Sequence, residues 1–411
     1  MNFPNLPKDV KYILDTLHKN GYEGYIVGGC VRDAIMGIPP HDWDMTTSAK
    51  PEEVKKLFSH TFDTGIKHGT VTVVLNKENY EITTYRIEGG YDDCRHPNDV
   101  SFTTDLHEDL LRRDFTMNAI AYNEEEGYVD IFGGIGDIAK KTIKGVGEAD
   151  ERFKEDALRM LRAVRFSAQL GFDIEEKTEE ALRENCGLIE KISAERIREE
   201  TTKLFLSKYT QKAVLLWETG LLQHISKEID ASLKGHEEEF LQSLKNAEKN
   251  VSVLFALFLR FLPCEKVVSA MRGLKFDVKT IKETECICRY FHREVIPERK
   301  EIRKFASEAG ENFALVLKAK YACGDDNAKK AMDIYKDILE KGECLYIKDL
   351  AISGNDIKSL GVENGKEVGA MLKFALETVL DEPHMNEKHK LMEAVKNRLG
   401  MSKLRKACLG L

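Results

Sequence analysis

The stretch GGCVRDAIMGIPPHDWDMTT, residues 28–47, decides what fold and chemistry we expect of this chain. Gly28 and Gly29 follow a short apolar run and precede a helical pattern. The main chain there can approach a phosphate closely, and a helix N-terminus attracts anions. Arg32 adds a fixed fork of donors that suits a triphosphate. A plain turn remains the better explanation of a Gly-Gly pair taken alone.

Two aspartates turn this stretch into a candidate metal site. The run around Trp43 is interpreted as a strand, in which Asp42 and Asp44 share one face while Trp43 points into the core. Such close carboxylates repel each other unless a cation lies between them, and their hard oxygens suit Mg²⁺, which also binds substrate phosphates. A solvated acidic strand end is the alternative for an isolated D-x-D. Glu81, in YEITTYR at 80–86, is predicted as a third metal or base residue, against an ordinary surface position.

A second motif, EDLLRRDFTMNAIAY at 108–122, places charged residues before an apolar run that we interpret as helical. Arg113 is predicted to hold phosphates or the sugar. Asp114 and Asn118 are predicted to contact a ribose hydroxyl, and helix capping is the competing interpretation of Asp114. A third motif, VDIFGGIGDIAKKTIKGVG at 129–147, is interpreted as a hinge whose role is structural rather than chemical.

The fourth motif, EDALRMLRAVRF at 155–166, carries charges at every third residue. We interpret residues 151–170 as helical, so that these charges form a slowly drifting polar stripe beside a buried apolar stripe. The polar stripe consists of Asp156, Arg159, Arg162 and Arg165, and the apolar stripe of Leu158, Leu161 and Val164. A solvated face of salt bridges is the alternative.

The chemistry of the bases gives this stripe a specific function. Cytosine and adenine each present an exocyclic amino donor beside a ring-nitrogen acceptor, whereas guanine and uracil present the reverse order. Asp156 would accept from the amino group and Arg159 would donate to the ring nitrogen. A wrong base would leave buried charged groups unpaired and would be rejected. Arg162 and Arg165 would then face phosphates or an incoming RNA.

The whole chain is expected to form two to four domains, because its 411 residues exceed one typical core. The first ~145 residues mix β-type runs with helical patterns, which predicts an α/β or α+β domain with a hairpin turn at 76–79. From about Asp150 onward the patterns are helical. The net charge of −8 counts mildly against RNA binding but leaves room for a local basic channel.

Neither a signal peptide nor a membrane segment is expected. The most apolar stretch, VSVLFALFLRFL from Val251, is too short to span a bilayer and contains Arg260, so we interpret it as a buried helix. The nine cysteines are scattered, which is typical of reduced thiols. We therefore expect a cytoplasmic protein.

The four motifs, in this order, resemble those of class II tRNA nucleotidyltransferases, the CCA-adding enzymes and the related bacterial poly(A) polymerases. The resemblance is dense over the first ~200 residues. It includes ISAERIREE at 192–200, which looks like the family's fifth motif, and it thins toward ISGNDIKSLGVENGKEVGAML at 352–372. The resemblance implies an α+β fold: a polymerase-β-like nucleotidyltransferase head followed by an all-helical neck, body and tail. The implied bounds are 1–147 for the catalytic head, 148–210 for the base-recognising neck, 211–300 for the body and 301–411 for the tRNA-binding tail.

The resemblance also implies roles for individual residues. Asp42 and Asp44 match the metal-binding aspartates, and Asp156 and Arg159 match the base-reading pair, with Arg162 and Arg165 beside it. The matches to nucleotide-holding residues are Gly29, Arg32 and Arg113. The implied reaction is attack of the tRNA 3′-hydroxyl on the α-phosphate of CTP or ATP, with Mg²⁺ as cofactor and release of pyrophosphate. The tRNA would be bound by its 3′ end and acceptor arm, and neither a membrane nor a protein partner is implied.

Subtype is a separate question. RIEGGYDDCRHPNDVSF at 86–102 looks like the flexible loop that enzymes adding the final A possess and CC-only enzymes lack. An enzyme that adds only the final A keeps the same loop and stays an alternative. The basic signature of poly(A) polymerases is missing after the aspartates, where FDTGIKHGTVTVVL stands at 62–75. A catalytically silent RNA binder is disfavoured because clustered carboxylates repel RNA, and a small-molecule nucleotidyltransferase because ~200 helical residues suit a large substrate.

Overall fold

The computed structural model describes residues 6–65, 69–91 and 97–408, and these form two compact units. The first unit contains the residues up to Glu237 together with Gly273–Lys275. The second contains Glu238–Arg272 and the residues from Phe276 onward. Each unit has its own buried apolar residues.

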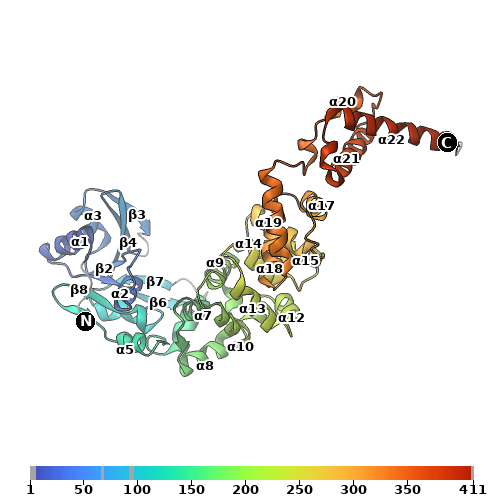
Figure 1. Ribbon diagram of the computed structural model, residues 1–411. Coiled ribbons are helices and arrows are strands. Elements are labelled where there is room, and N and C mark those ends of the chain that lie inside the picture. The colour runs from blue at the N-terminus through green and yellow to red at the C-terminus, as the bar shows by residue number, and fades with distance from the viewer. Residues whose placement is uncertain (1–5, 66–68, 92–96, 409–411) are drawn as a thin grey trace. The chain divides into compact units, whose positions relative to one another are not determined.

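A seven-stranded sheet forms the centre of the first unit, in the order β3-β4-β5-β2-β1-β8-β9 (Figure 1). Neighbouring strands are antiparallel, except that β2 and β5 run parallel. Two pairs lie outside this sheet, β6 with β7 and β10 with β11. The strands are β1 (Gly24–Val27), β2 (Met45–Thr47), β3 (Thr61–Gly65), β4 (Thr70–Leu75), β5 (Glu78–Thr84), β6 (Arg86–Tyr91), β7 (Pro97–Phe102), β8 (Ala121–Asn123), β9 (Gly127–Val129), β10 (Thr142–Ile143) and β11 (Asp173–Ile174).

The helices of the first unit cover the sheet and then continue the chain. In α1, Val10, Ile13, Leu14 and Leu17 are buried, which is the spacing of one helix face. The helices are α1 (Lys8–Lys19), α2 (Gly29–Ile35), α3 (Pro51–Leu57), α4 (Leu106–Leu111), α5 (Gly134–Ala139), α6 (Ala149–Glu155), α7 (Leu158–Leu170), α8 (Glu176–Asn185), α9 (Ala194–Phe205), α10 (Leu215–Glu218), α11 (Leu221–Ile225) and α12 (Lys227–Leu233).

The hairpin predicted at 76–79 is confirmed. Strands β4 and β5 pair antiparallel and are joined through Asn76 and Lys77, whose φ angles are +50° and +71°. Positive φ at both central residues is the backbone of the tight turn that matches the twist of two paired strands, and asparagine tolerates it well. The hairpin brings β5 next to β2, the strand that follows the two aspartates.

Two local predictions were wrong. Asp42 and Asp44 do not lie in a strand, because β2 begins only at Met45, and Trp43 is half-buried instead of pointing into the core. The apolar run after Asp114 is not a helix either: it forms a single 3₁₀ turn, Thr116–Asn118, and then enters strand β8. Tertiary pairing with β1 outweighs the local helical pattern there.

The helix predicted over 151–170 is interrupted. Helix α6 ends at Glu155 and α7 begins at Leu158, with the backbone of Asp156 extended at φ −134° and ψ 101°. The side chain of Asp156 accepts a hydrogen bond from the amide of Leu158, the first residue of α7, at 3.1 Å. Asp156 therefore lies at a helix junction, and only the three arginines lie on α7. The predicted apolar stripe of Leu158, Leu161 and Val164 is buried, as expected.

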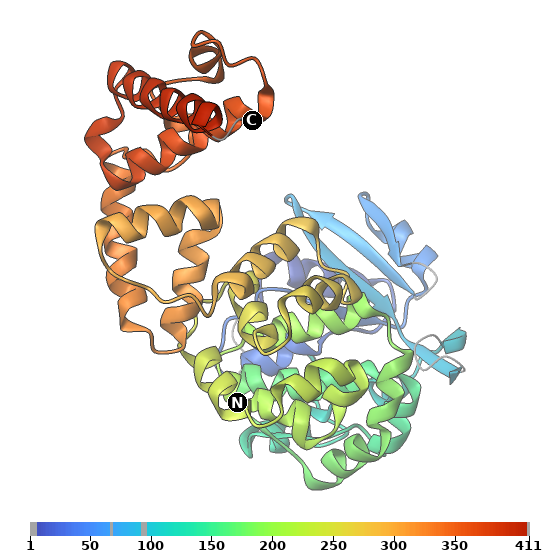
Figure 2. The same cartoon turned by 90° about the vertical axis from the view of Figure 1, so that its right-hand side faces the viewer.

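Among the described residues of the second unit, the regular elements are all helices, joined by turns and loops (Figures 1 and 2). Every residue of α14 after Val251 is buried, as predicted for this apolar stretch. Within the described part of the chain, every helix is too short or too polar to cross a membrane. The helices are α13 (Glu237–Asn246), α14 (Val251–Leu259), α15 (Cys264–Gly273), α16 (Val278–Tyr290), α17 (Arg299–Ala309), α18 (Phe313–Ala322), α19 (Asp326–Glu340), α20 (Gly354–Lys358), α21 (Gly365–Asp381) and α22 (Lys388–Cys408).

Two aspartates of the third motif make structural contacts, whereas its role as a hinge stays a prediction. Both oxygens of Asp130 accept backbone hydrogen bonds from the first turn of α5, at Gly134 (2.7 Å) and Ile135 (2.9 Å). Asp137 accepts from the hydroxyl of Thr116 at 2.7 Å. These contacts fix α5 against the 3₁₀ turn that carries Asn118.

We expect Gly134→Ala to destabilise the first unit and Gly136→Ala to leave it intact. A Cβ at position 134 would lie 2.1 Å from the carbonyl oxygen of Thr116, which is main chain and cannot swing away. The cost should be about 1–3 kcal/mol of unfolding free energy, as for overpacking. The same Cβ at position 136 meets nothing within 4 Å, and alanine favours a helix by about 0.5–1 kcal/mol. Chemical denaturation measures both, and equal effects would contradict the packing argument.

Candidate active site

A cavity of ≈ 650 Å³ in the first unit brings the predicted site residues together. Arginines outnumber aspartates among the residues that line it, so the cavity suits an anionic ligand. The lining residues are Gly28, Gly29, Arg32, Asp42, Asp44, Arg112, Arg113, Asp114, Asn118, Asp156, Leu158, Arg159, Arg162, Arg165, Phe166, Arg196 and Lys203. All predicted site residues except Glu81 are in this set.

The two aspartates enter the cavity from the segment that precedes β2. The carbonyl oxygen of Asp44 accepts a hydrogen bond from the amide of Val27 at 3.0 Å, which ties the Asp44 main chain to β1. Desolvation raises the pKa of Asp44; Arg113 lowers it and Asp42 raises it further, and the net shift is upward. Because the negative charge of Asp44 is unfavourable next to Asp42, the two carboxylates together are suited to binding a cation.

Gly28 allows an arginine to approach the chain closely. Its φ is +83°, and a Cβ at this position would lie 3.2 Å from Nη1 of Arg113. A side chain there would therefore be strained and would also press on Arg113. Gly29 follows as the first residue of α2, which places Arg32 on the same short helix.

Buried Asp109 orients two of the arginines. Its Oδ1 accepts from Nε and Nη2 of Arg112 at 3.0 and 2.7 Å, and its Oδ2 accepts from Nη2 of Arg113 at 3.3 Å and from the Thr46 hydroxyl at 3.1 Å. Burial alone would raise the pKa of Asp109, but Arg112 and Arg113 outweigh burial and lower it. Nε of Arg113 is buried and has no hydrogen-bond partner among the described residues, although the Arg113 side chain lines the cavity.

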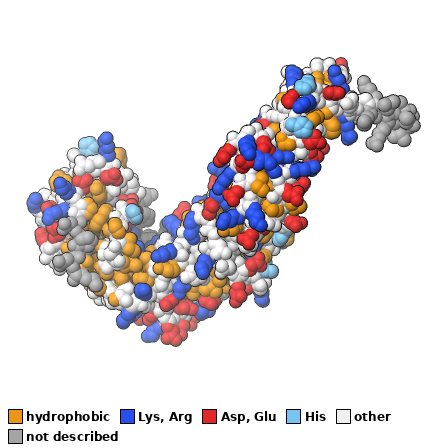
Figure 3. Space-filling model, viewed as in Figure 1, with side chains coloured by type: hydrophobic (Ala, Val, Ile, Leu, Met, Phe, Trp, Pro, Cys, Tyr) orange, Lys and Arg blue, Asp and Glu red, His pale blue; other side chains and the backbone are white. Residues whose placement is uncertain are grey.

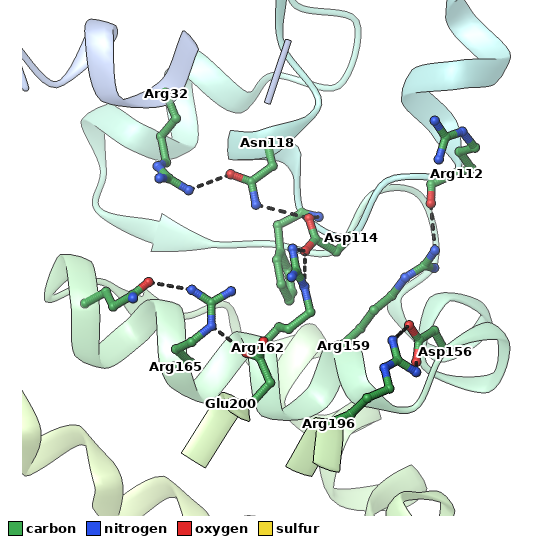
Figure 4. A network of polar contacts seen from close by, with 12 residues as sticks. Arg32, Arg112, Asp114, Asn118, Asp156, Arg159, Arg162, Arg165, Arg196 and Glu200 are labelled. Carbon is green, nitrogen blue, oxygen red and sulfur yellow. Dashed lines mark hydrogen bonds and ion pairs between the residues drawn. The ribbon is translucent and has the colours of Figure 1, made fainter. Parts of the chain in front are cut away.

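Asp114 is the centre of a polar chain that crosses the cavity (Figure 4). Its Oδ2 accepts from Nε and Nη2 of Arg162 at 2.8 and 2.6 Å, and its Oδ1 accepts from the Phe115 amide and from Asn118. Asn118 in turn accepts from Nη1 of Arg32 at 2.8 Å. Burial would raise the pKa of Asp114, but Arg162, Asn118 and Arg159 together lower it to about 2.

The hydrogen bonds of Asp114 bear on the predicted contact of Asp114 and Asn118 with a ribose hydroxyl. A carboxylate has about four acceptor sites, and Asp114 uses two on each oxygen. A ribose hydroxyl would have to displace one of these partners. Asn118 keeps one amide hydrogen and one acceptor site beyond the bonds given for it, so it is the better placed of the two.

Three guanidinium groups surround the ring of Phe166. The carbons Cζ of Arg32, Arg162 and Arg165 lie 5.3, 5.3 and 3.9 Å from the ring centroid. The π-face attracts each cation and keeps the three apart. Phe166 also contacts Phe115 edge to face at 5.9 Å, which anchors the ring in the core. The result is a fixed group of positive charges at one wall of the cavity.

Arg159 is held mainly by main chain. Its Nη1 donates to the carbonyl of Arg152 at 3.2 Å and to Glu155 at 2.6 Å, and its Nη2 donates to the carbonyl of Arg112 at 2.7 Å. A guanidinium has five N–H groups, so its Nε–H and one Nη2–H remain without a partner among the described residues. Asp156 lies nearby and is paired with Arg196 of α9 (Figure 4).

Glu81 does not line the cavity. It is exposed on β5, where it pairs with Thr72 and precedes Ile82, the residue opposite Met45 of β2. The strand register therefore places Glu81 near the level of Asp44, the residue that immediately precedes β2. Its role as a third metal or base residue stays a prediction.

Sequence reasoning missed several residues that shape this site: Asp109, Phe166, Arg196, Glu200 and Lys203. Glu200 pairs with Nε of Arg165 at 2.5 Å, and both side chains are buried. Arg165, predicted to face phosphates or RNA, is thus held by Glu200 and by Gln169. The signal that was available is the charged fifth motif at 192–200, which contains both Arg196 and Glu200.

Three family models match successive parts of the chain. A poly A polymerase head domain matches residues 24–144, and a probable RNA and SrmB-binding site of polymerase A matches 171–233. A putative tRNA nucleotidyltransferase domain 2 matches 242–395. Together these matches cover most of the chain.

Full-length relatives and solved structures agree with these matches. A CCA-adding enzyme of Lactobacillus delbrueckii subsp. bulgaricus is 41% identical over 376 residues, which is 90% of this chain and 92% of that protein. One of Lactobacillus gasseri is 39% identical over 92% and 94% of the two chains. The crystal structure of the Bacillus stearothermophilus CCA-adding enzyme in complex with CTP is similar with a TM-score of 0.83 and 32% identity, covering 97% of this chain and 98% of that one.

We expect Glu200→Ala to destabilise the protein strongly and Glu199→Ala to change little. Removing Glu200 leaves the buried guanidinium of Arg165 without its carboxylate partner, which typically costs about 3–5 kcal/mol of unfolding free energy. Glu199 is its neighbour on the same helix, with a side chain that is 60% exposed, so its loss should cost no more than about 0.5 kcal/mol. If the two variants unfold at the same denaturant concentration, the buried pair contributes no such stability.

Proposed function

The chain belongs to the CCA-adding enzymes, a family of tRNA nucleotidyltransferases, and from this premise we propose that it builds and repairs the 3′-terminal CCA of tRNA. The substrates are CTP, ATP and a tRNA with an incomplete end, and each addition releases pyrophosphate. No nucleic-acid template is needed, because side chains of the protein select the base.

The observation that carries this proposal is the state of the Asp156–Arg159 pair. Arg159 keeps two N–H groups, and Asp156 keeps an acceptor site on Oδ2, beyond the bonds that fix each residue. One donor beside one acceptor is the complement of the edge that cytosine and adenine share. Guanine and uracil would set donor against donor and acceptor against acceptor, and the loss of paired charged groups would reject them.

We assign the triphosphate to a second group of residues that line the cavity. Arg32 and Arg113 supply guanidinium groups, and Nε of Arg113 is buried with an unsatisfied donor. Gly28 and Gly29 let the backbone approach a phosphate because they carry no side chain. Arg162 and Arg165 are tied to Asp114 and Glu200, so they contribute fixed positive charge and need no rearrangement.

The residues present fit Mg²⁺. Mg²⁺ is usually held by one or two carboxylates together with substrate phosphates, and Asp42 and Asp44 provide two carboxylates beside the arginine-lined cavity. The raised pKa of Asp44 reflects a pair that a cation would relieve. When bound, the ion supplies charge neutralisation at the reacting phosphate. Among the described residues no group of three or more His, Cys, Asp or Glu side chains is assembled for a metal, which agrees with a site completed by the nucleotide.

The chain's own groups then position the reactants. The base pairs with Asp156 and Arg159 while the arginines orient the phosphates, so that the 3′-hydroxyl of the tRNA can attack the α-phosphate in line with the departing pyrophosphate. Holding reactants in this geometry accounts for much of the acceleration of a phosphoryl transfer. The fixed guanidinium groups stabilise the charge that develops on the leaving group.

The second unit supplies candidate surface for the rest of the tRNA. Figure 3 shows several Lys or Arg side chains over α19, and Lys329, Lys330 and Lys336 of this helix are exposed. A local basic surface attracts phosphates even on a chain with a net charge of −8. We assign base recognition to residues 148–210 and tRNA binding to the helices after them, chiefly residues 301–411.

An enzyme that adds only the final A remains the second candidate. The segment that resembles the A-adding loop, residues 86–102, forms the hairpin of β6 and β7, in which Arg86 pairs with Phe102 and Tyr91 with Pro97. Its tip, residues 92–96, lies outside the described residues. The presence of this hairpin favours addition of A as one activity, and poly(A) synthesis is the least favoured alternative.

Three tRNA transcripts test the proposal: one ending at the discriminator base, one ending in C and one ending in CC. Each is incubated with Mg²⁺ and CTP, ATP or both, and the products are sized on a gel. We expect all three to be extended to CCA and no further. A single A added only to the CC transcript would identify an A-adding enzyme, a long A ladder would identify a poly(A) polymerase, and no extension would identify a silent binder.

In the same assay we expect Asp44→Asn to lower the rate about a thousandfold, because a bound metal contributes several kcal/mol to the transition state. Binding of tRNA, measured by filter retention, should persist, since Asp44 repels rather than attracts phosphates. Glu52→Gln, at an exposed position of α3 outside the lining of the cavity, is the control and should stay active. A rate for Asp44→Asn within about tenfold of wild type would exclude Asp44 as a metal ligand.

We also expect replacement of residues 89–97 by a short turn to block addition of A while sparing addition of C. The paired ends of β6 and β7 would still close the shortened hairpin, so the sheet and the cavity should be preserved. The measurement compares CTP addition to the transcript lacking CCA with ATP addition to the CC transcript. Equal loss of both activities would refute the role of this hairpin in A addition.

A further inference from the structure

Arg196 forms an ion pair with the carboxylate of Asp156, the proposed base-reading residue. It lies on α9, and its Nη1 and Nη2 donate to Oδ1 and Oδ2 of Asp156 at 3.2 and 2.8 Å (Figure 4). Both side chains line the cavity. This fork-to-fork geometry fixes the plane of the carboxylate as well as its position, which a single hydrogen bond would not do.

Counting acceptor sites shows what this contact leaves open. A carboxylate offers about four acceptor sites, two on each oxygen. Oδ1 of Asp156 accepts from the Leu158 amide at 3.1 Å and from Arg196, and Oδ2 accepts from Arg196. Among the described residues, one acceptor site on Oδ2 is left, and its direction is set by the plane that Arg196 imposes.

We propose that Arg196 is a specificity-determining positioning residue: it aims the last acceptor site of Asp156 at the exocyclic amino group of cytosine or adenine. The proposal rests on the proposed function of the Asp156–Arg159 pair. Arg196 does not touch the base in this role. It acts through Asp156 alone.

The direction of this acceptor site matters because uracil and guanine could otherwise bind to Asp156 as well. Uracil and guanine also carry a donor, but on the ring nitrogen, next to the place where the amino group of a correct base would lie. A carboxylate free to rotate about its side-chain bonds can follow that donor and accept from it. A carboxylate held in one plane cannot, so the wrong base leaves this acceptor site of Asp156 unsatisfied. Loss of Arg196 should therefore relax selection more than it slows the reaction.

The experiment measures kcat/KM for CTP and UTP on the transcript ending at the discriminator base, and for ATP and GTP on the CC transcript. Wild type, Arg196→Ala and Arg196→Lys are compared, with Glu199→Gln as a matched control on the exposed side of the same helix. We expect the CTP-to-UTP and ATP-to-GTP ratios to fall at least about tenfold in Arg196→Ala. Arg196→Lys, which keeps the charge but not the fork, should fall in between, and Glu199→Gln should match wild type.

A purely structural ion pair predicts a different result. Arg196→Ala would then lose activity with all four nucleotides equally, and unchanged ratios would overturn the proposal. If Arg196→Ala does not fold, Arg196→Lys decides, because unchanged ratios in a folded and active Arg196→Lys also overturn it. If wild type adds CCA but the Arg196 variants keep the wild-type ratios, only the role of Arg196 is refuted. Wild type that adds no nucleotide refutes the proposed function, and the role of Arg196 with it.

Discussion

The ion pair between Asp114 and Arg162 is the contact on which the rest of the cavity depends. A buried carboxylate is tolerable only when every acceptor site is satisfied, and Asp114 meets this condition with Arg162, Asn118 and the Phe115 amide. Asp114 lies shortly after α4, whereas Arg162 belongs to α7. One ion pair thus joins the sheet-bearing part of the first unit to the helix that carries Arg159.

Much of the cavity was readable from the sequence because its residues lie in short motifs with a fixed order. Asp42, Asp44 and Arg32 come from one stretch of twenty residues, residues 28–47, and the structure places all three in the cavity. The strands were also predictable where β-branched residues alternate and a two-residue turn follows, as in β4 and β5. The change from such runs to helical patterns near Asp150 indicated where the helical part begins, and the family resemblance implied the α+β class.

What could not be read was decided by partners far along the chain. Periodicity predicts one helix through Asp156, but the pair with Arg196, forty residues later, accompanies an extended residue at that point. The run after Asp114 has a helical pattern, yet its pairing with β1 makes it a strand. Nor does local sequence say that Glu200 rather than solvent faces Arg165. Long-range electrostatic and strand contacts carry no periodic signal, so single-sequence reasoning does not reach them.

The two members of the base-reading pair are supported in different ways, and this has an evolutionary consequence. Arg159 donates to the main-chain carbonyls of Arg152 and Arg112, which every amino acid possesses. The position of Arg159 should therefore be kept when Arg152 or Arg112 is substituted. Asp156 is held by the side chain of Arg196, so its geometry depends on which amino acid occupies position 196. Lineages of this protein should tolerate change around the arginine but exchange Asp156 and Arg196 only together, which makes the carboxylate half of the pair the less evolvable one.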